Sequence, residues 1–63
     1  MPIIRVTMME GRTEQQVEAM IEAVTEAVHH TLDAPRESVR VLVDELPKTH
    51  WGIAGKTAEK LGR

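Results

Sequence analysis

The chain has 63 residues, a formal net charge of −2, no cysteine and one aromatic residue, Trp51. A domain of this size buries only about 60% of the surface that its unfolded chain exposes, so a monomer is marginally stable. The absence of cysteine excludes disulfides and thiolate metal sites. His29 and His30 are adjacent, point about 100° apart on a helix and cannot share a metal ion. Association between chains is therefore the favoured source of stability.

The composition also excludes several kinds of partner. Clusters of basic residues interleaved with aromatic residues, which favour nucleic-acid binding, are missing. No stretch approaches the run of about eighteen apolar residues that a membrane span needs, and the N-terminus lacks the apolar segment of a signal peptide. We expect a single domain, residues 1–63, in a cytoplasmic protein that binds no nucleic acid, membrane or metal.

Pro2 directly follows Met1 and precedes an apolar run. Methionine aminopeptidases remove the first methionine when the second residue is small, and the mature chain then begins with a secondary amine held rigid by its ring. An α-amino group titrates near neutrality, and apolar surroundings or a nearby arginine lower its pKa further. Such an amine is a candidate general base. The alternative is a Met-Pro start without functional meaning.

Residues 3–9 alternate as a strand does, with one apolar face formed by Ile4, Val6 and Met8. After a turn at Gly11, Thr13 begins a helix, and its spacing to Gln16 fits a capping box. One apolar stripe follows the helix at i, i+3, i+4 and i+7 spacing: Val17, Met20, Ile21, Val24, Val28 and Leu32. An opposite row of glutamates is interpreted as a solvated face without chemistry: Glu14, Glu18, Glu22 and Glu26. Pro35 ends the helix, since the residue before a proline disfavours helical geometry.

Residues 39–45 predict a second strand that is rich in β-branched residues, with Val39, Val41 and Val43 on one face. Two strands joined by a helix form a β-α-β unit with parallel strands and a right-handed crossover. The valine face turns toward the helix. The opposite face of the sheet mixes apolar and charged residues, namely Ile3, Met9, Leu42, Arg5 and Arg40. Such a face is poorly suited to water and again favours a partner subunit.

Residues 46–56 contain Pro47, Gly52 and Gly55 and predict a loop or short hairpin that reaches onto a neighbouring chain. The tail, residues 57–63, is compatible with one weak helical turn. The predicted fold is therefore α/β: a single β-α-β unit with parallel strands plus a short C-terminal hairpin, assembled as an oligomer.

Five short segments occur in order along the chain: Met1-Pro2-Ile3, Glu10-Gly11-Arg12-Thr13, Leu32-Asp33-Ala34-Pro35, Ser38-Val39-Arg40-Val41 and His50-Trp51-Gly52-Ile53. With these segments at these separations, the chain resembles the 4-oxalocrotonate tautomerases, the small members of the tautomerase superfamily, over essentially its whole length. The resemblance implies an isomerase of aromatic hydrocarbon catabolism. It would need no cofactor to convert a 2-hydroxydienoate such as 2-hydroxymuconate to its conjugated 2-oxo form.

The resemblance also implies roles for individual residues. Pro2, once Met1 is removed, matches the amino-terminal proline that moves the proton. Arg40 matches the strand arginine that binds a substrate carboxylate, and Arg12 matches the turn arginine that holds the opposite carboxylate. The apolar wall of the site would include Met9, Trp51 and Ile53. The family forms hexamers, trimers of dimers, in which each site is assembled from more than one subunit, so a homohexamer that binds a small dicarboxylate or enol is expected.

Two departures from the family pattern bear on substrate choice. Trp51 is bulkier than the usual phenylalanine and predicts a narrower or shifted pocket, and the ending Leu61-Gly62-Arg63 lacks one distal arginine. Two other functions stay open. One is a hydratase or dehalogenase of the superfamily that acts on unsaturated acids. The sequence identifies no water-activating carboxylate for it, and Glu10 stays open for that role. The other is an oligomeric binding module without catalysis.

Structural alternatives also stay open for the individual site residues. Arg12 is then a solvated turn residue, and Arg40 pairs with Asp44 or Glu45 across an interface. Trp51 is then an interface residue without a catalytic role.

Overall fold

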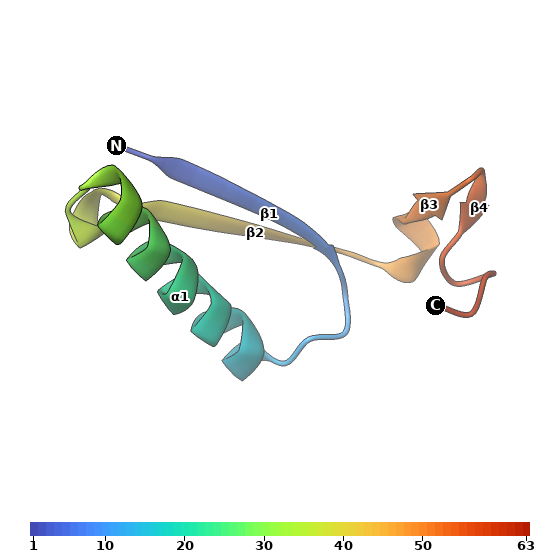
Figure 1. The fold of residues 1–63 in the computed structure, drawn as a ribbon. Helices are drawn as coiled ribbons and strands as arrows, with labels where there is room; N and C mark the ends of the chain where they lie inside the picture. The colour runs from blue at the N-terminus through green and yellow to red at the C-terminus, as the bar shows by residue number, and fades with distance from the viewer.

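Strand β1 (Ile3–Met9) leads into helix α1 (Glu14–Leu32), and strand β2 (Arg40–Leu46) returns parallel to β1 (Figure 1). The computed structural model describes residues 1–63. Two short 3-10 helices flank β2, η1 (Arg36–Ser38) and η2 (Lys48–His50). The two-residue strands β3 (Gly52–Ile53) and β4 (Lys56–Thr57) then form an antiparallel hairpin. The predicted α/β fold, a β-α-β unit with parallel strands and a C-terminal hairpin, is confirmed.

The bounds of the strands follow the sequence pattern closely. β1 covers the predicted residues 3–9, whereas β2 begins and ends one residue later than the predicted 39–45. The reason for the later start is that Val39 donates its backbone N–H to the Arg36 carbonyl (3.1 Å) and so closes η1 instead of joining the sheet. Val39 still lies on the apolar side, where it is buried.

Helix α1 begins where the sequence predicts. The Gln16 backbone N–H donates to Thr13 Oγ1 (3.1 Å), and the Thr13 N–H donates to Gln16 Oε1 (2.9 Å), so the capping box satisfies two amides that the helix leaves free. The helix ends at Asp33, which adopts a left-handed conformation (φ 54°). The helix therefore stops two residues before Pro35, at the left-handed residue.

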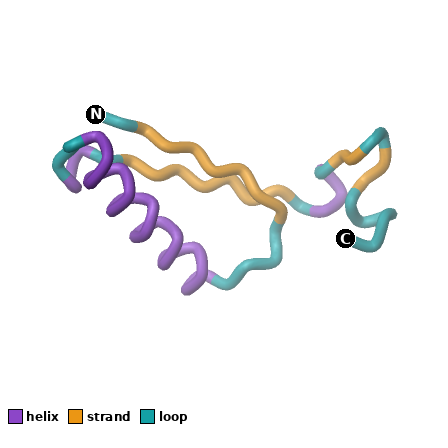
Figure 2. Tube along the Cα trace, viewed as in Figure 1, coloured by secondary structure: helices purple, strands orange, loops and turns teal.

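Helix α1 covers one face of the two-stranded sheet, and the other face is open (Figures 1 and 2). The residues of the predicted apolar face, Ile4, Val6, Met8, Val41 and Val43, are all half-buried. The opposite face exposes Ile3 and Leu42, whose exposed fractions are 58% and 44%. Arg5 and Asp44 also lie on this face, where Arg5 Nη2 is 3.9 Å from Asp44 Oδ2. The predicted division of the sheet into two faces is thus confirmed.

The core of one protomer is very small, because Val39 and Ala58 are its only buried residues. The radius of gyration is 14.6 Å, compared with about 11 Å for a compact chain of this length. The excess arises from the C-terminal hairpin, which extends beyond the carboxyl end of β2, away from β1 and α1 (Figure 1). Such a protomer buries little of its surface and is marginal as a monomer, so the fold favours association. No helix is both long enough and apolar enough to span a membrane.

Candidate active site

Pro2 and Arg40 lie together at the amino-terminal edge of the sheet. The register of the parallel strands pairs Ile3 with Arg40, and the Arg40 backbone N–H donates to the Pro2 carbonyl (3.0 Å). Pro2 is half-buried, whereas Met1 is 79% exposed and extends from the end of the strand. Two of the predicted catalytic residues are therefore neighbours within one protomer.

The side chain of Arg40 is held by its own backbone neighbourhood. Its Nη1 donates to the carbonyl of Glu37 (2.7 Å) and, at longer range, to that of Val39 (3.3 Å). Nε and Nη2 have no hydrogen-bond partner within the protomer, and no carboxylate pairs with this guanidinium. Within the protomer, Asp44 lies 3.9 Å from Arg5, so its predicted alternative pairing with Arg40 across an interface stays a prediction. The free Nε and Nη2 groups lie side by side on one edge of the guanidinium, the arrangement that matches the two oxygens of a carboxylate.

Arg12 lies at the opposite end of the sheet, in the exposed loop between β1 and α1. Gly11 precedes it with a φ of 128°, a backbone conformation that residues with a Cβ rarely adopt. A pocket of about 160 Å³ opens here, lined by Met8, Arg12, Gln16, Val17 and Met20. Arg12 forms no ion pair within the protomer, so its charge is available to an anion or to another subunit.

One protomer does not gather all six predicted site residues. Met9 ends β1 beside Leu46, and a strand of seven residues separates its two ends by about 20 Å. Met9 and Arg12 are thus at the far edge from Pro2 and Arg40. Trp51 and Ile53 are half-buried in the C-terminal hairpin beyond β2. The six residues therefore occupy three separate regions of one protomer.

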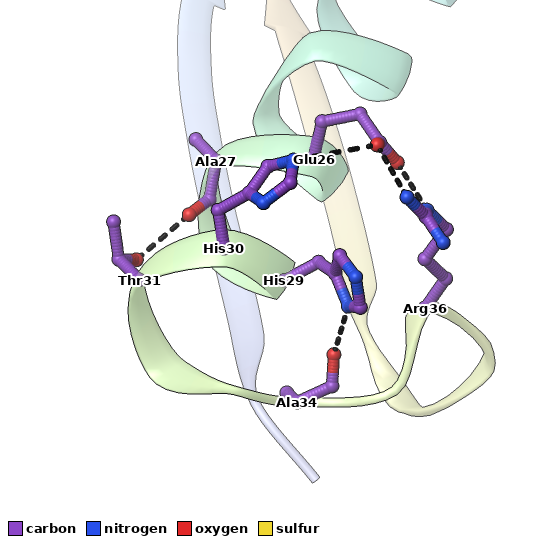
Figure 3. Close-up of polar contacts among 7 residues, drawn as sticks. All are labelled: Glu26, Ala27, His29, His30, Thr31, Ala34 and Arg36. Atoms are coloured by element: carbon purple, nitrogen blue, oxygen red, sulfur yellow. Dashed lines mark hydrogen bonds and ion pairs between the residues drawn. The ribbon is translucent and has the colours of Figure 1, made fainter.

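A polar cluster at the end of α1 was not predicted from the sequence (Figure 3). Arg36 donates from Nε to Glu26 Oε2 (2.6 Å) and from Nη2 to Glu26 Oε1 (2.9 Å). The hydrogen bond from Arg36 and its positive charge hold the pKa of Glu26 below its usual value, and the same contact raises the pKa of Arg36. The interpretation of the glutamate row as merely solvated is therefore wrong for Glu26. No local spacing signals this pair, because ten residues and a chain reversal separate its members.

The same cluster contains both adjacent histidines. His29 Nδ1 lies 2.6 Å from the Ala34 carbonyl, and since a carbonyl only accepts, His29 carries its proton on Nδ1. His30 Nε2 lies 4.0 Å from Glu26. No group of three or more histidine and carboxylate side chains comes close enough together to hold a metal ion.

Comparison with known proteins identifies the family of the chain. The profile of the family described as "Tautomerase enzyme" matches residues 2–61. The 2-hydroxymuconate tautomerase of Pseudomonas sp. (strain CF600) is 51% identical over 63 residues, which is the full length of both chains.

Solved structures share the fold as well. A 4-oxalocrotonate tautomerase isozyme from Methylibium petroleiphilum has a TM-score of 0.92 at 43% identity, over 97% of this chain and 95% of that one. A heterohexameric 4-oxalocrotonate tautomerase from Chloroflexus aurantiacus J-10-fl has a TM-score of 0.90 at 34% identity, over 97% and 98% of the two chains. With a family match across nearly the whole chain and full-length relatives at about half identity, the protein belongs to the tautomerase family of enzymes.

Proposed function

We propose that the protein is a cofactor-independent isomerase that ketonises a 2-hydroxydienoate such as 2-hydroxymuconate, with the amine of Pro2 as base and then acid. The observation that carries the proposal is the hydrogen bond between the Arg40 N–H and the Pro2 carbonyl, which sets a guanidinium with a free fork beside the chain start. The activity named for the full-length relatives supports the same choice of substrate.

The chemistry requires only a proton carrier and a cationic clamp. The amine of Pro2 removes the proton of the 2-hydroxyl group, the C2–O bond becomes a carbonyl, and the electron pair moves along the conjugated chain. The distant carbon then takes the proton back from the prolinium, so the product is an isomer of the substrate. The base has to bind the proton and then release it, which favours a pKa near the working pH. The free fork of Arg40 binds the neighbouring carboxylate and stabilises the negative charge that develops there.

The complete site would draw on more than one copy of the chain. We infer that Arg12 holds the opposite carboxylate and that Met9, Trp51 and Ile53 form the apolar wall, each delivered by a neighbouring subunit. The separation of these residues within the protomer and its small core support association. We propose a homohexamer built as a trimer of dimers, the assembly that the resemblance to the family implies. Trp51, with its large ring, would narrow the pocket and favour slender substrates.

Changes at the N-terminus test the proposal. We expect intact mass to show that Met1 is absent, and we expect the purified protein to ketonise 2-hydroxymuconate without added metal or cofactor. Pro2→Ala leaves a primary amine in place of the ring and should keep only part of the activity. A variant with one residue appended before Pro2 should lose the reaction, because an amide nitrogen accepts no proton.

Phenylenolpyruvate, which carries one carboxylate, serves as a second substrate in the same assays. Full activity in a chain shown by mass to keep Met1 would refute the amine as the base. Turnover of an acetylenic or halogenated acid in place of the enols would instead favour the hydratase or dehalogenase function.

A further inference from the structure

We propose that the Glu26–Arg36 ion pair, which joins α1 to η1, is a positioning device for the guanidinium of Arg40. The inference rests on the function proposed above for Arg40. Neither Glu26 nor Arg36 would contact substrate, and both would act through the backbone of η1.

The first step is the geometry of the ion pair. Most exposed ion pairs contribute little to stability, but a bidentate pair of arginine and carboxylate is the exception because both side chains are held in one plane. The two contacts of Arg36 with Glu26, at 2.6 and 2.9 Å, form such a pair. It connects the last turns of α1 to the first residue of η1 across the chain reversal (Figure 3).

A second contact connects the same two elements. His29, one turn after Glu26, donates from Nδ1 to the carbonyl of Ala34 (2.6 Å). The chain between Asp33 and Arg36 is therefore held at two points by the side chains of α1. A connection of this length without such contacts would have considerable freedom, since it contains no element of its own.

The third step leads from η1 to Arg40. The Pro35 carbonyl accepts from the Ser38 N–H (3.0 Å) and from Ser38 Oγ (2.8 Å), and the Arg36 carbonyl accepts from the Val39 N–H. These bonds orient the Glu37 carbonyl, which accepts the hydrogen bond from Arg40 Nη1 at 2.7 Å. The orientation of the free Nε and Nη2 groups thus follows from η1, and the position of η1 follows from Glu26.

The test compares Glu26→Ala with Glu22→Ala. Glu22 lies one turn earlier in the same row of glutamates on α1, is exposed and forms no ion pair, whereas Glu26 is half-buried. Both changes replace a glutamate by alanine inside the helix, so the change in intrinsic helix propensity is the same. We expect Glu26→Ala to lower kcat/KM for 2-hydroxymuconate about tenfold, because small displacements of a substrate-binding group are costly. Glu22→Ala should leave kcat/KM unchanged. Arg36→Lys, which keeps the charge but loses the fork, should give an intermediate loss.

A double-mutant cycle separates positioning of Arg40 from a general structural role. In an Arg40→Ala background, Glu26→Ala should have no further effect, whereas in an Arg12→Ala background its full effect should persist. An equal loss in both backgrounds would overturn the proposal, because the ion pair would then support the fold and not Arg40.

A measurement without substrate decides the same point independently. The Nε–Hε signal of Arg40, identified by its loss in Arg40→Lys, reports the order of the guanidinium through ¹⁵N relaxation. We expect its order parameter to fall in Glu26→Ala and to stay unchanged in Glu22→Ala, and unchanged order in both would refute the positioning role. If the wild type fails to ketonise either enol, the proposed function fails, while this comparison still decides whether Glu26 orders Arg40.

Discussion

At the scale of single residues, two arginines with free charge and one proline carry the proposed chemistry. Arg40 is partly fixed by backbone carbonyls and keeps one hydrogen-bonding edge free, while Arg12 lies on an exposed loop without an ion pair. Both arrangements differ from that of Arg36, whose fork is fully used by Glu26. The free arginines are thus distinguished from the structural one by their partners and not by their exposure.

Replacing the two arginines separates binding from rate. We expect Arg40→Ala to raise KM and lower kcat for 2-hydroxymuconate, because its charge acts on both the ground state and the developing dienolate. Arg12→Ala should chiefly raise KM, and should matter little for phenylenolpyruvate, which lacks the second carboxylate. Arg40→Lys should recover only part of the loss, since lysine lacks the bidentate fork. Steady-state kinetics provide the check, with sedimentation as the control for assembly. Unchanged kinetics in both alanine variants would show that the two arginines are solvated residues without a role in the reaction.

Stability should depend on pH through Glu26. Its pKa is lower in the folded state than its usual value because Arg36 hydrogen-bonds to the ionised form. A lowered pKa stabilises the fold above the pKa of the unfolded state, and this stabilisation is lost as pH falls through the folded-state pKa. We expect the difference in urea midpoint between wild type and Glu26→Ala to be present at neutral pH and to shrink as the pH falls below the usual pKa of a glutamate and through the folded-state pKa of Glu26. Glu22→Ala, at the same protein concentration, should show no such trend, and a difference that persists in acid would contradict the assignment.

At the scale of elements, the turn of the hairpin places an alanine in the left-handed region. Ala54 (φ 51°) and Gly55 (φ 85°) connect β3 to β4, and a type I′ turn requires positive φ at both central positions. Glycine adopts this conformation freely, whereas alanine in the left-handed region is strained. The residue that closes the hairpin of Trp51 and Ile53 therefore stores strain that a single substitution can release.

Ala54→Gly should stabilise the protein by about 0.5–1 kcal/mol, because relief of the left-handed alanine outweighs the greater freedom of glycine in the unfolded chain. Gly55→Ala should destabilise it by about 1 kcal/mol for the converse reason. Thermal unfolding at a fixed protein concentration measures both. Ala23→Gly, in the exposed interior of α1, is the matched control and should destabilise by about 1 kcal/mol. A loss of stability in Ala54→Gly would contradict the strain at the turn.

At the scale of the whole molecule, the protomer leaves apolar surface and an extended hairpin without intramolecular contacts to cover them. Only Val39 and Ala58 are buried, the sheet exposes Ile3 and Leu42 on its open face, and the hairpin extends away from the β-α-β unit. Each of these features is explained if other copies of the chain cover the open face and receive the hairpin. Catalysis and folding would then depend on the same contacts.

Assembly is the prediction that belongs to this scale. We expect sedimentation to report a hexamer and the melting temperature to rise with protein concentration, as mass action requires. Leu42→Glu introduces a charge into the open face of the sheet and should yield smaller species with lost secondary structure. Ala23→Glu, at an exposed position of α1, should leave the hexamer intact. A stable, compact monomer of the wild type at micromolar concentration would rule out both the assembly and a shared site.

Most of the fold was predictable because its signals are local. The alternation in residues 3–9, the capping box of Thr13 and Gln16, and the glycines of the C-terminal hairpin all act over a few residues. The prediction of parallel strands also followed, since a helix of this length returns the chain in the same direction. The error of one residue in β2 arose where Val39 closes a turn, a choice that depends on η1.

The sequence by itself determined the β-α-β unit, its apolar face and the family, because periodicity, capping and short motifs are written in neighbouring residues. Only the tertiary structure decided that Ile3 pairs with Arg40, and hence that Pro2 lies beside that arginine. Only the structure joined Glu26 to Arg36 and dispersed the six candidate site residues over three regions. Strand register and contacts across a chain reversal depend on how distant segments pack, and no spacing along the chain encodes them.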